Sequence, residues 1–207
     1  MQATTLDSRA LPTAEALRPL LPGGSLKAGV AYSVRGSTSL AMLMLAGPSA
    51  AGAWCGVVGA PDFGVEAAAA AGLDLSRLVL VPDPGQHWLP VTAQLADVLN
   101  VVLVRPPAAA RDTDASRLAS RLRQRGATLV VQGPWQQAEA VLEVVSSSWH
   151  GLGAGHGYLA GRDAEVEVTA RGGLRSRHPL RFADAALGRL AATASTTPVP
   201  VLEATSA

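Results

Sequence analysis

Short runs of apolar residues recur along the first two thirds of the chain and alternate with longer segments of helical periodicity. The runs that we interpret as strands are residues 30–34, 54–58, 78–81, 101–104 and 129–131. Aliphatic runs of this length are typical of parallel strands that are covered on both faces. The intervening segments that favour helices are residues 40–46, 63–71, 88–99 and 113–124. This alternation predicts right-handed β-α-β units and a mostly parallel, twisted sheet flanked by helices, which is an α/β fold.

The pattern changes after residue 140. Residues 141–149 and 164–170 alternate apolar and polar positions, which predicts antiparallel strands with one exposed face. Between them lies the glycine-rich stretch of residues 151–157, with the spacing G-x-G-x-G-x-G. A dinucleotide-binding loop should lead into a helix, whereas here a strand follows, so we interpret the stretch as a hairpin connection. The expected fold therefore ends in an antiparallel hairpin extension.

These patterns divide the chain into three parts. Residues 1–21 form an N-terminal lead-in, residues 22–173 the core, and residues 174–207 a C-terminal segment. In the last part we expect a basic, turn-rich stretch up to residue 181 and a short helix over 182–192, both outside the sheet. The remaining Thr-, Pro- and Ser-rich tail is expected to be disordered.

Composition narrows the function classes. The chain of 207 residues has a net charge of +1, which does not indicate a general electrostatic attraction to nucleic acid. Its one cysteine, Cys55, excludes an internal disulfide, and its four histidines are scattered, so no metal site is expected. We see no signal peptide and no membrane-spanning run, and we expect a cytoplasmic protein.

The most informative stretch is the turn that joins the first buried run to the first helix. A strand, a glycine-rich turn and a helix make the geometry in which P-loop proteins bind phosphate. The turn reads Arg35, Gly36, Ser37, Thr38, Ser39, and aliphatic residues follow where a P-loop has Lys and Thr. The only lysine of the chain, Lys27, lies before the strand. We interpret the turn as a degenerate P-loop whose hydroxyl residues cap the helix.

A second position that ATPases require is also changed. In P-loop ATPases another buried strand ends in an aspartate that supports the Mg²⁺-bound water. Here the corresponding position, directly after the run 101–104, is Arg105. Because both positions depart from the pattern together, we expect no ATPase, no other enzyme activity and no cofactor.

The core from about residue 20 to residue 173 resembles the RecA fold, and within it the actinobacterial ImuA-prime type, a degenerate RecA-like family related to ImuA and SulA. The stretches that carry the resemblance are VRGSTSLAML, AGAWCGVVGAPDFGVEAAAAAGLDLSRLVLVPDPG, VVLVRPP and SSWHGLGAGHGYLAGR. The resemblance implies an accessory role in damage-induced mutagenic translesion DNA synthesis. It implies binding to ImuB, a Y-family-like adaptor, and through ImuB to an error-prone polymerase alpha subunit and the sliding clamp.

Two other functions stay open. The first is a SulA-like cell-division inhibitor that binds the division tubulin homologue. The second is a RecA-like DNA-binding protein that uses residues 106–114, although one arginine and two aspartates suit phosphate poorly.

The region after the predicted core is the candidate for partner contact, because it mixes arginines with apolar anchors. The candidate residues are Arg175, Arg177, Arg181, Phe182, Leu187 and Leu190. The plainer alternative is an ordinary packed terminal segment. For Trp149, near the end of an alternating strand, a core position is favoured over an interface.

Overall fold

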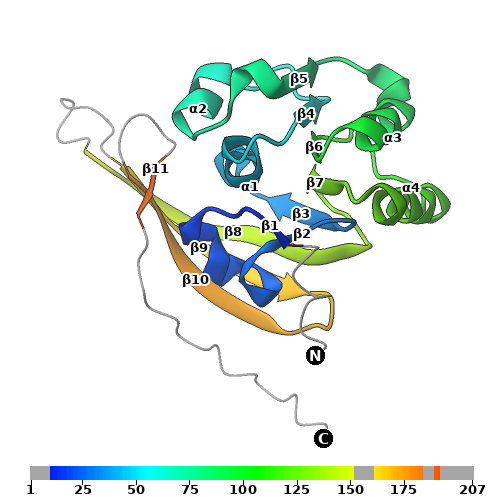
Figure 1. The fold of residues 1–207 in the computed structure, drawn as a ribbon. Coiled ribbons are helices and arrows are strands. Elements are labelled where there is room, and N and C mark those ends of the chain that lie inside the picture. Colours follow the sequence, from blue (N-terminus) through cyan, green and yellow to red (C-terminus); the bar gives the residue numbers. More distant parts are fainter. Residues whose placement is uncertain (1–9, 152–160, 184–188, 192–207) are drawn as a thin grey trace, which may run out of the picture.

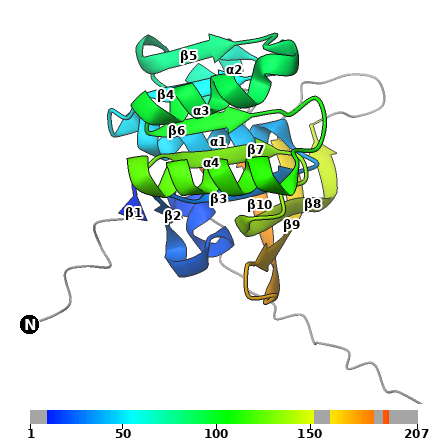
Figure 2. The same ribbon diagram turned by 90° about the vertical axis from the view of Figure 1, so that its right-hand side faces the viewer.

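The computed structural model describes residues 10–151, 161–183 and 189–191 (Figure 1). A twisted sheet lies at the centre, with α1 and α2 on one face and α3 and α4 on the other (Figures 1 and 2). The helices are α1 (Thr38–Ala50), α2 (Val65–Ala70), α3 (Trp88–Val98) and α4 (Asp112–Arg125), with short 3₁₀ helices η2 (Glu15–Leu20), η3 (Pro22–Gly24), η4 (Leu75–Arg77) and η5 (Gly85–His87). The described strands are β1 (Ala10–Leu11), β2 (Leu26–Lys27), β3 (Ala31–Arg35), β4 (Cys55–Val58), β5 (Leu78–Val81), β6 (Val101–Val104), β7 (Thr128–Gln132), β8 (Ala138–His150), β9 (Gly161–Ala170), β10 (Arg175–Ala183) and β11 (Arg189–Ala191).

Within the described residues the main sheet has nine strands in the order β11-β10-β9-β8-β3-β7-β6-β4-β5. The strands from β8 to β5 are all paired in parallel, and β3 lies between β7 and β8. The strand that leads into the degenerate P-loop is therefore central. The expected RecA-like α/β architecture, a mostly parallel twisted sheet with helices on both faces and a C-terminal antiparallel extension, is confirmed.

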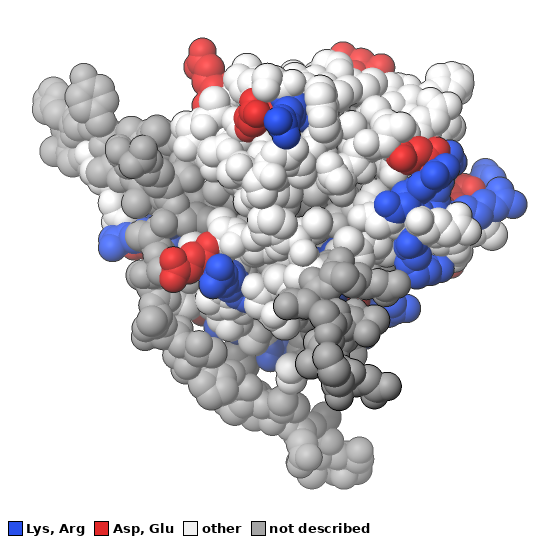
Figure 3. Space-filling model, viewed as in Figure 1, with Lys and Arg blue, Asp and Glu red and all other residues white. Residues whose placement is uncertain are grey.

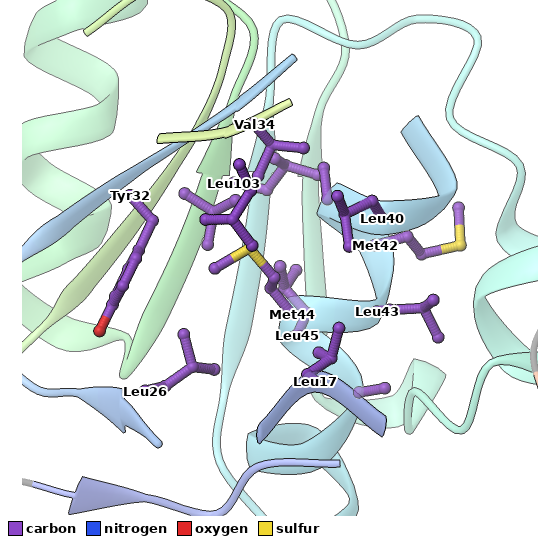
Figure 4. Close-up of a cluster of buried hydrophobic side chains, with 14 of the residues drawn as sticks. Leu17, Leu26, Tyr32, Val34, Leu40, Met42, Leu43, Met44, Leu45 and Leu103 are labelled. Atoms are coloured by element: carbon purple, nitrogen blue, oxygen red, sulfur yellow. The ribbon is translucent and has the colours of Figure 1, made fainter. Parts of the chain in front are cut away.

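Two apolar clusters fill the space on the two faces of the sheet. The cluster on the α1 face joins α1 to the sheet and to η2, and Figure 4 shows Leu17, Leu26, Tyr32 and Leu103 around that helix. The other cluster packs α3 and α4 against β6 and β7. Burial on both faces explains the aliphatic runs 101–104 and 129–131 in these strands.

Helix α1 is apolar around its whole circumference because it is covered on all sides. Leu40, Met44 and Leu45 are fully buried, between the sheet and the N-terminal segment. The helix runs to Ala50, past the end that the Gly47-Pro48 pair predicts. Pro48 has no backbone N–H, so the helix loses the one hydrogen bond that this position would donate. The amide of Ala51 still donates to the carbonyl of Gly47 at 3.2 Å. The predicted helix end is therefore wrong by about one turn.

The antiparallel extension is larger than the sequence indicates. β8 pairs in parallel with β3 and antiparallel with β9, as the alternation predicts. β9 then pairs antiparallel with β10 along nine residues, and β10 pairs with β11. Residues 171–192 were expected outside the sheet, as a turn-rich stretch and a helix; that prediction is wrong for residues 175–183 and 189–191, which are strands of the sheet, whereas residues 184–188 and 192 lie outside the described part. The sheet continues past the domain boundary predicted at residue 173.

The reason is a period-two pattern that is easily missed in a basic stretch. Ser176, His178, Leu180 and Phe182 share one side of β10, and three of these side chains are buried there. The arginines alternate with them on the other side. The glycine-rich connection from residue 152 to 157 and the tail from residue 192 lie outside the described residues. None of the helices in the described part is both long and apolar enough to cross a membrane.

Candidate functional site

The candidate site lies at the carboxyl edge of the parallel strands, where ligand sites of α/β sheets usually form. β3 ends at Arg35 and is followed by the turn that leads to α1, β6 is followed by Arg105, and β7 ends at Gln132. Because these strands are parallel neighbours, their ends meet at one edge. The structure thus brings together the degenerate P-loop and the altered end of the second strand.

The turn before α1 uses its polar atoms internally. Ser37 is the N-cap, and its hydroxyl accepts a hydrogen bond from the amide of Leu40 at 3.1 Å, so the predicted capping role is confirmed. Gly36 has a φ of 74°, and a Cβ placed there would lie 3.1 Å from the carbonyl oxygen of Val144. The turn therefore packs closely against β8 and needs glycine. Arg35 pairs loosely with Glu143 of β8 at 3.8 Å.

Arg105 connects two elements across the edge. Its Nη2 pairs with Asp62, which follows β4, and its Nε donates to Oε1 of Gln132 at 3.3 Å. The hydrogen bond from Arg105 lowers the pKa of the Asp62 carboxyl below its usual range. The side-chain amide of Gln132 in turn donates to the hydroxyl of Thr38 at 2.6 Å. We call these four linked side chains, Asp62, Arg105, Gln132 and Thr38, the edge network.

A shallow hollow of about 350 Å³ lies over this network, lined by Val34, Arg35, Gly36, Thr38, Arg105, Gln132 and Gly133. A second hollow of about 200 Å³ adjoins it at Arg105, and its other walls are mainly proline-rich loops. Two arginines line the first hollow, and each is paired with a carboxylate, Arg35 with Glu143 and Arg105 with Asp62. What the first hollow lacks is the lysine that grips the outer phosphates and the carboxylate that supports Mg²⁺ in an ATPase.

Among the described residues of this edge, no side chain of a nucleophile is hydrogen-bonded to a base; the described Ser–His contact, between His178 Nε2 and the hydroxyl of Ser176 at 2.9 Å, lies on β10. Ser37 is engaged in capping, and burial raises the pKa of the Cys55 thiol to about 11, which leaves it without nucleophilic character at neutral pH. No group of three or more His, Cys, Asp or Glu side chains within the described part of the chain has a metal-binding arrangement. The edge network can present hydrogen-bond donors to a bound molecule and forms a rigid surface.

The residues expected to contact a partner are divided between two faces of β10. Arg175, Arg177 and Arg181 lie on the exposed face, where Arg177 pairs with Glu167 at 3.0 Å and Arg181 pairs with Asp163 at 2.9 Å. Phe182 is only 2% exposed and belongs to the core, so it can support the strand but cannot itself reach a partner. The backbone of Leu190 is opposite Phe182 in β11, and Leu187 lies outside the described residues.

Two groups of residues were missed by the sequence reasoning. Gln132 is a polar residue directly after the aliphatic run 129–131, just as Arg105 directly follows the run 101–104, so the same sequence pattern could have identified it. Arg162 stacks between Trp149 and Phe182, with its guanidinium carbon 5.3 Å and 5.5 Å from the two ring centres. Trp149 is 49% exposed, so its core position, favoured on the sequence, is wrong, and its cross-strand pairing with Arg162 becomes visible only with the register.

Comparisons with known proteins place the site inside a recognised region. The family model described as the MT3502 N-terminal domain matches residues 19–137, which include all four side chains of the edge network and stop just before β8. An uncharacterized protein of Mycobacterium tuberculosis is 40% identical over 124 residues, which is 56% of this chain. The alignment covers 59% of the length of that relative. This relative comes from an actinobacterium, which agrees with the expectation that the chain belongs to an actinobacterial family.

Proposed function

The chain belongs to the family of the MT3502 N-terminal domain, and on the ground of its resemblance to the ImuA-prime type we propose that it is a non-catalytic accessory protein of damage-induced mutagenic translesion DNA synthesis. It binds ImuB in the cytoplasm and, through ImuB, helps to organise the error-prone polymerase alpha subunit at the sliding clamp. The fold serves in this role as a rigid scaffold.

The observation that carries the proposal is the edge network. In an ATPase of this architecture the carboxyl edge of the sheet holds phosphates and Mg²⁺. Here Arg105 and Gln132 connect Asp62 to Thr38 across that edge through the protein's own side chains. A triphosphate would have to break these contacts and would find no lysine after the turn. A RecA-like scaffold with these substitutions is suited to protein contact.

The surface that we propose for ImuB is the exposed face of β10, with Arg175, Arg177 and Arg181. Two of these arginines are held by carboxylates of β9, so their positions are set before binding. Such preorganisation lowers the entropic cost of forming an interface. Phe182 contributes from the opposite face by anchoring the strand in the core.

Co-purification with ImuB tests the role. Because β10 is part of the core, deleting it would unfold the protein, and surface substitutions are the appropriate variants. We expect the full chain to recover ImuB, the Arg175→Ser/Arg177→Ser pair to lose it, and the Arg117→Ser/Arg123→Ser pair on α4 to keep it. Each pair removes two positive charges, so a difference between the two variants depends on which surface carries the charges and not on net charge.

The adaptor role is wrong if the full chain recovers no ImuB from DNA-damaged cells. Recovery of the division tubulin homologue instead supports the SulA-like alternative. A calorimetric titration with ATP and Mg²⁺ tests nucleotide binding separately, and no heat of binding is expected at millimolar nucleotide. ATP hydrolysis that disappears in a Thr38→Ala variant would overturn the non-catalytic assignment.

A further inference from the structure

Positive charge is concentrated on one helix. The last nine residues of α4 include Arg117, Arg121, Arg123 and Arg125 and no acidic residue, although the whole chain has a net charge of only +1. In the space-filling view the blue side chains gather over α4, on the right-hand side of the molecule (Figure 3). We call these four residues the α4 arginine surface.

Only part of this charge is neutralised by the protein. Asp97 on α3 pairs with Arg121 and, at 3.3 Å, with Arg125, and the hydrogen bond from Arg121 lowers the pKa of that carboxyl. Arg123 donates to the hydroxyl of Ser120 at 3.0 Å. Arg117 has no ion pair among the described residues. About three positive charges are therefore available to another molecule.

Helix stability alone does not account for all four arginines. Cations in the last turn of a helix interact favourably with its dipole, which explains Arg123 and Arg125. The effect falls off within that turn, so it does not explain Arg117, which lies two turns earlier. From Arg117 to Arg125 the arginines extend along the helix for about 12 Å, since an α-helix rises about 1.5 Å per residue. At about 100° per residue, Arg123 lies about 120° around the helix axis from Arg117, so the arginines cover the solvent-facing part of the helix from two sides.

The composition of the surface indicates the kind of partner. The other exposed side chains on the same turns, Ser116, Ser120 and Gln124, are polar, and no large apolar side chain is exposed among them. Protein interfaces usually need buried aromatic or aliphatic anchors, which this surface lacks. Arginine binds phosphate with two parallel hydrogen bonds, and about 12 Å corresponds to about three or four phosphates of one DNA strand, at about 3.4 Å each.

We propose that the α4 arginine surface binds the sugar–phosphate backbone of a nucleic acid strand without reading its sequence. The site is separate from the carboxyl edge and from the exposed face of β10, so it is independent of the proposed contact with ImuB. A protein that binds its partner through β10 and a DNA backbone through α4 would hold the two together on different sides.

Fluorescence anisotropy with the full chain tests this site. The probe is a labelled DNA of about 20 nucleotides, single-stranded or paired with its complement. With about three phosphates contacted, the logarithm of the association constant should fall against the logarithm of salt concentration with a slope of about −2 for the single strand and about −3 for the duplex. The Arg117→Ser/Arg123→Ser pair should weaken binding at about 50 mM salt by about tenfold or more and flatten the slope.

The matched control is the Arg175→Ser/Arg177→Ser pair, which should leave DNA binding unchanged. Circular dichroism melting of both pairs shows whether either variant has lost its fold, and an Arg117→Lys/Arg123→Lys variant should restore most of the binding because charge is retained. The inference is overturned if the full chain does not bind either DNA at low salt, or if both serine pairs weaken binding equally. It is also overturned if a polyglutamate peptide competes better than unlabelled DNA, since the surface would then suit an acidic protein segment.

Discussion

The side-chain amide of Gln132, the last residue of β7, donates a hydrogen bond at 2.6 Å to the hydroxyl of Thr38, the first residue of α1. Gln132 also accepts from Arg105, so one amide connects the ends of two strands to the start of the helix. The turn that resembles a P-loop is in this way tied to the rest of the carboxyl edge.

Replacing Gln132 with leucine should destabilise the protein by about 1 kcal/mol, because it removes both hydrogen bonds from a partly buried position. Urea unfolding measures the change. Gln137→Leu is the control, since Gln137 bonds to Ser116 on the exposed surface and should change stability by less than about 0.5 kcal/mol. Equal losses in the two variants would mean that the edge network contributes no more than a surface contact.

Gly47→Ala should also destabilise, by about 1–3 kcal/mol, although alanine is the better helix former by about 1 kcal/mol. A Cβ at this position would lie 2.7 Å from the carbonyl oxygen of Pro12 and 2.9 Å from the amide nitrogen of Ala14. Both are backbone atoms, so neither can rotate away. Gly172→Ala has open space and should be nearly neutral in the same thermal melts. A raised melting temperature for Gly47→Ala would show that the N-terminal segment does not pack this closely.

Phe182→Ala tests whether β10 belongs to the core. The side chain is 2% exposed within the α1-side cluster, so its loss should lower the free energy of unfolding by about 3–5 kcal/mol. Arg175→Ala, on the exposed face of the same strand, should stay within about 0.5 kcal/mol. Denaturant titrations that found less than about 1 kcal/mol for Phe182→Ala would instead favour a loosely attached C-terminal segment.

His178 should make stability depend on pH. Burial lowers the pKa of this imidazole in the folded protein, so at pH values above about 6.5 it is neutral in both states and its contribution is complete. As the pH falls below about 6.5, the unfolded chain takes up a proton that the folded chain does not. Stability should then fall, by at most about 1.4 kcal/mol per pH unit, until the pH reaches the folded pKa.

Unfolding measured between about pH 5 and pH 8 should show this slope for the natural chain and a smaller slope for His178→Gln. His87→Gln, which removes an exposed imidazole, is the matched control. If His178→Gln keeps the full slope, other groups cause the acid sensitivity.

Local pattern was sufficient for the parallel half of the fold. The runs at 78–81 and 101–104 coincide with β5 and β6. β6 is buried along its whole length, which requires aliphatic side chains on both faces, whereas β5 is aliphatic although it is the edge strand and Leu80 is exposed. The missing lysine in the turn after β3 is equally a fact of the sequence. Both signals need only a few adjacent residues, which is why they could be predicted.

The parts that were predicted wrongly depend on distant residues. The basic residues of 175–183 hide a strand whose alternate positions are buried in the α1-side core, and this short period-two pattern is easily missed among arginines. Pro48 alone favours an earlier end of α1, but the packing that surrounds the helix on all sides lets it continue to Ala50.

By itself, then, the sequence determined that the chain forms an α/β sheet and that its glycine-rich turn has no lysine for phosphate, since each depends on short-range residue patterns. Only the tertiary structure decided what occupies the carboxyl edge. Thr38 and Gln132 are 94 positions apart in the chain, and Arg105 and Asp62 are 43 apart. Their side chains meet because parallel pairing brings the ends of separate strands to one edge, a relationship that no local pattern of residues encodes.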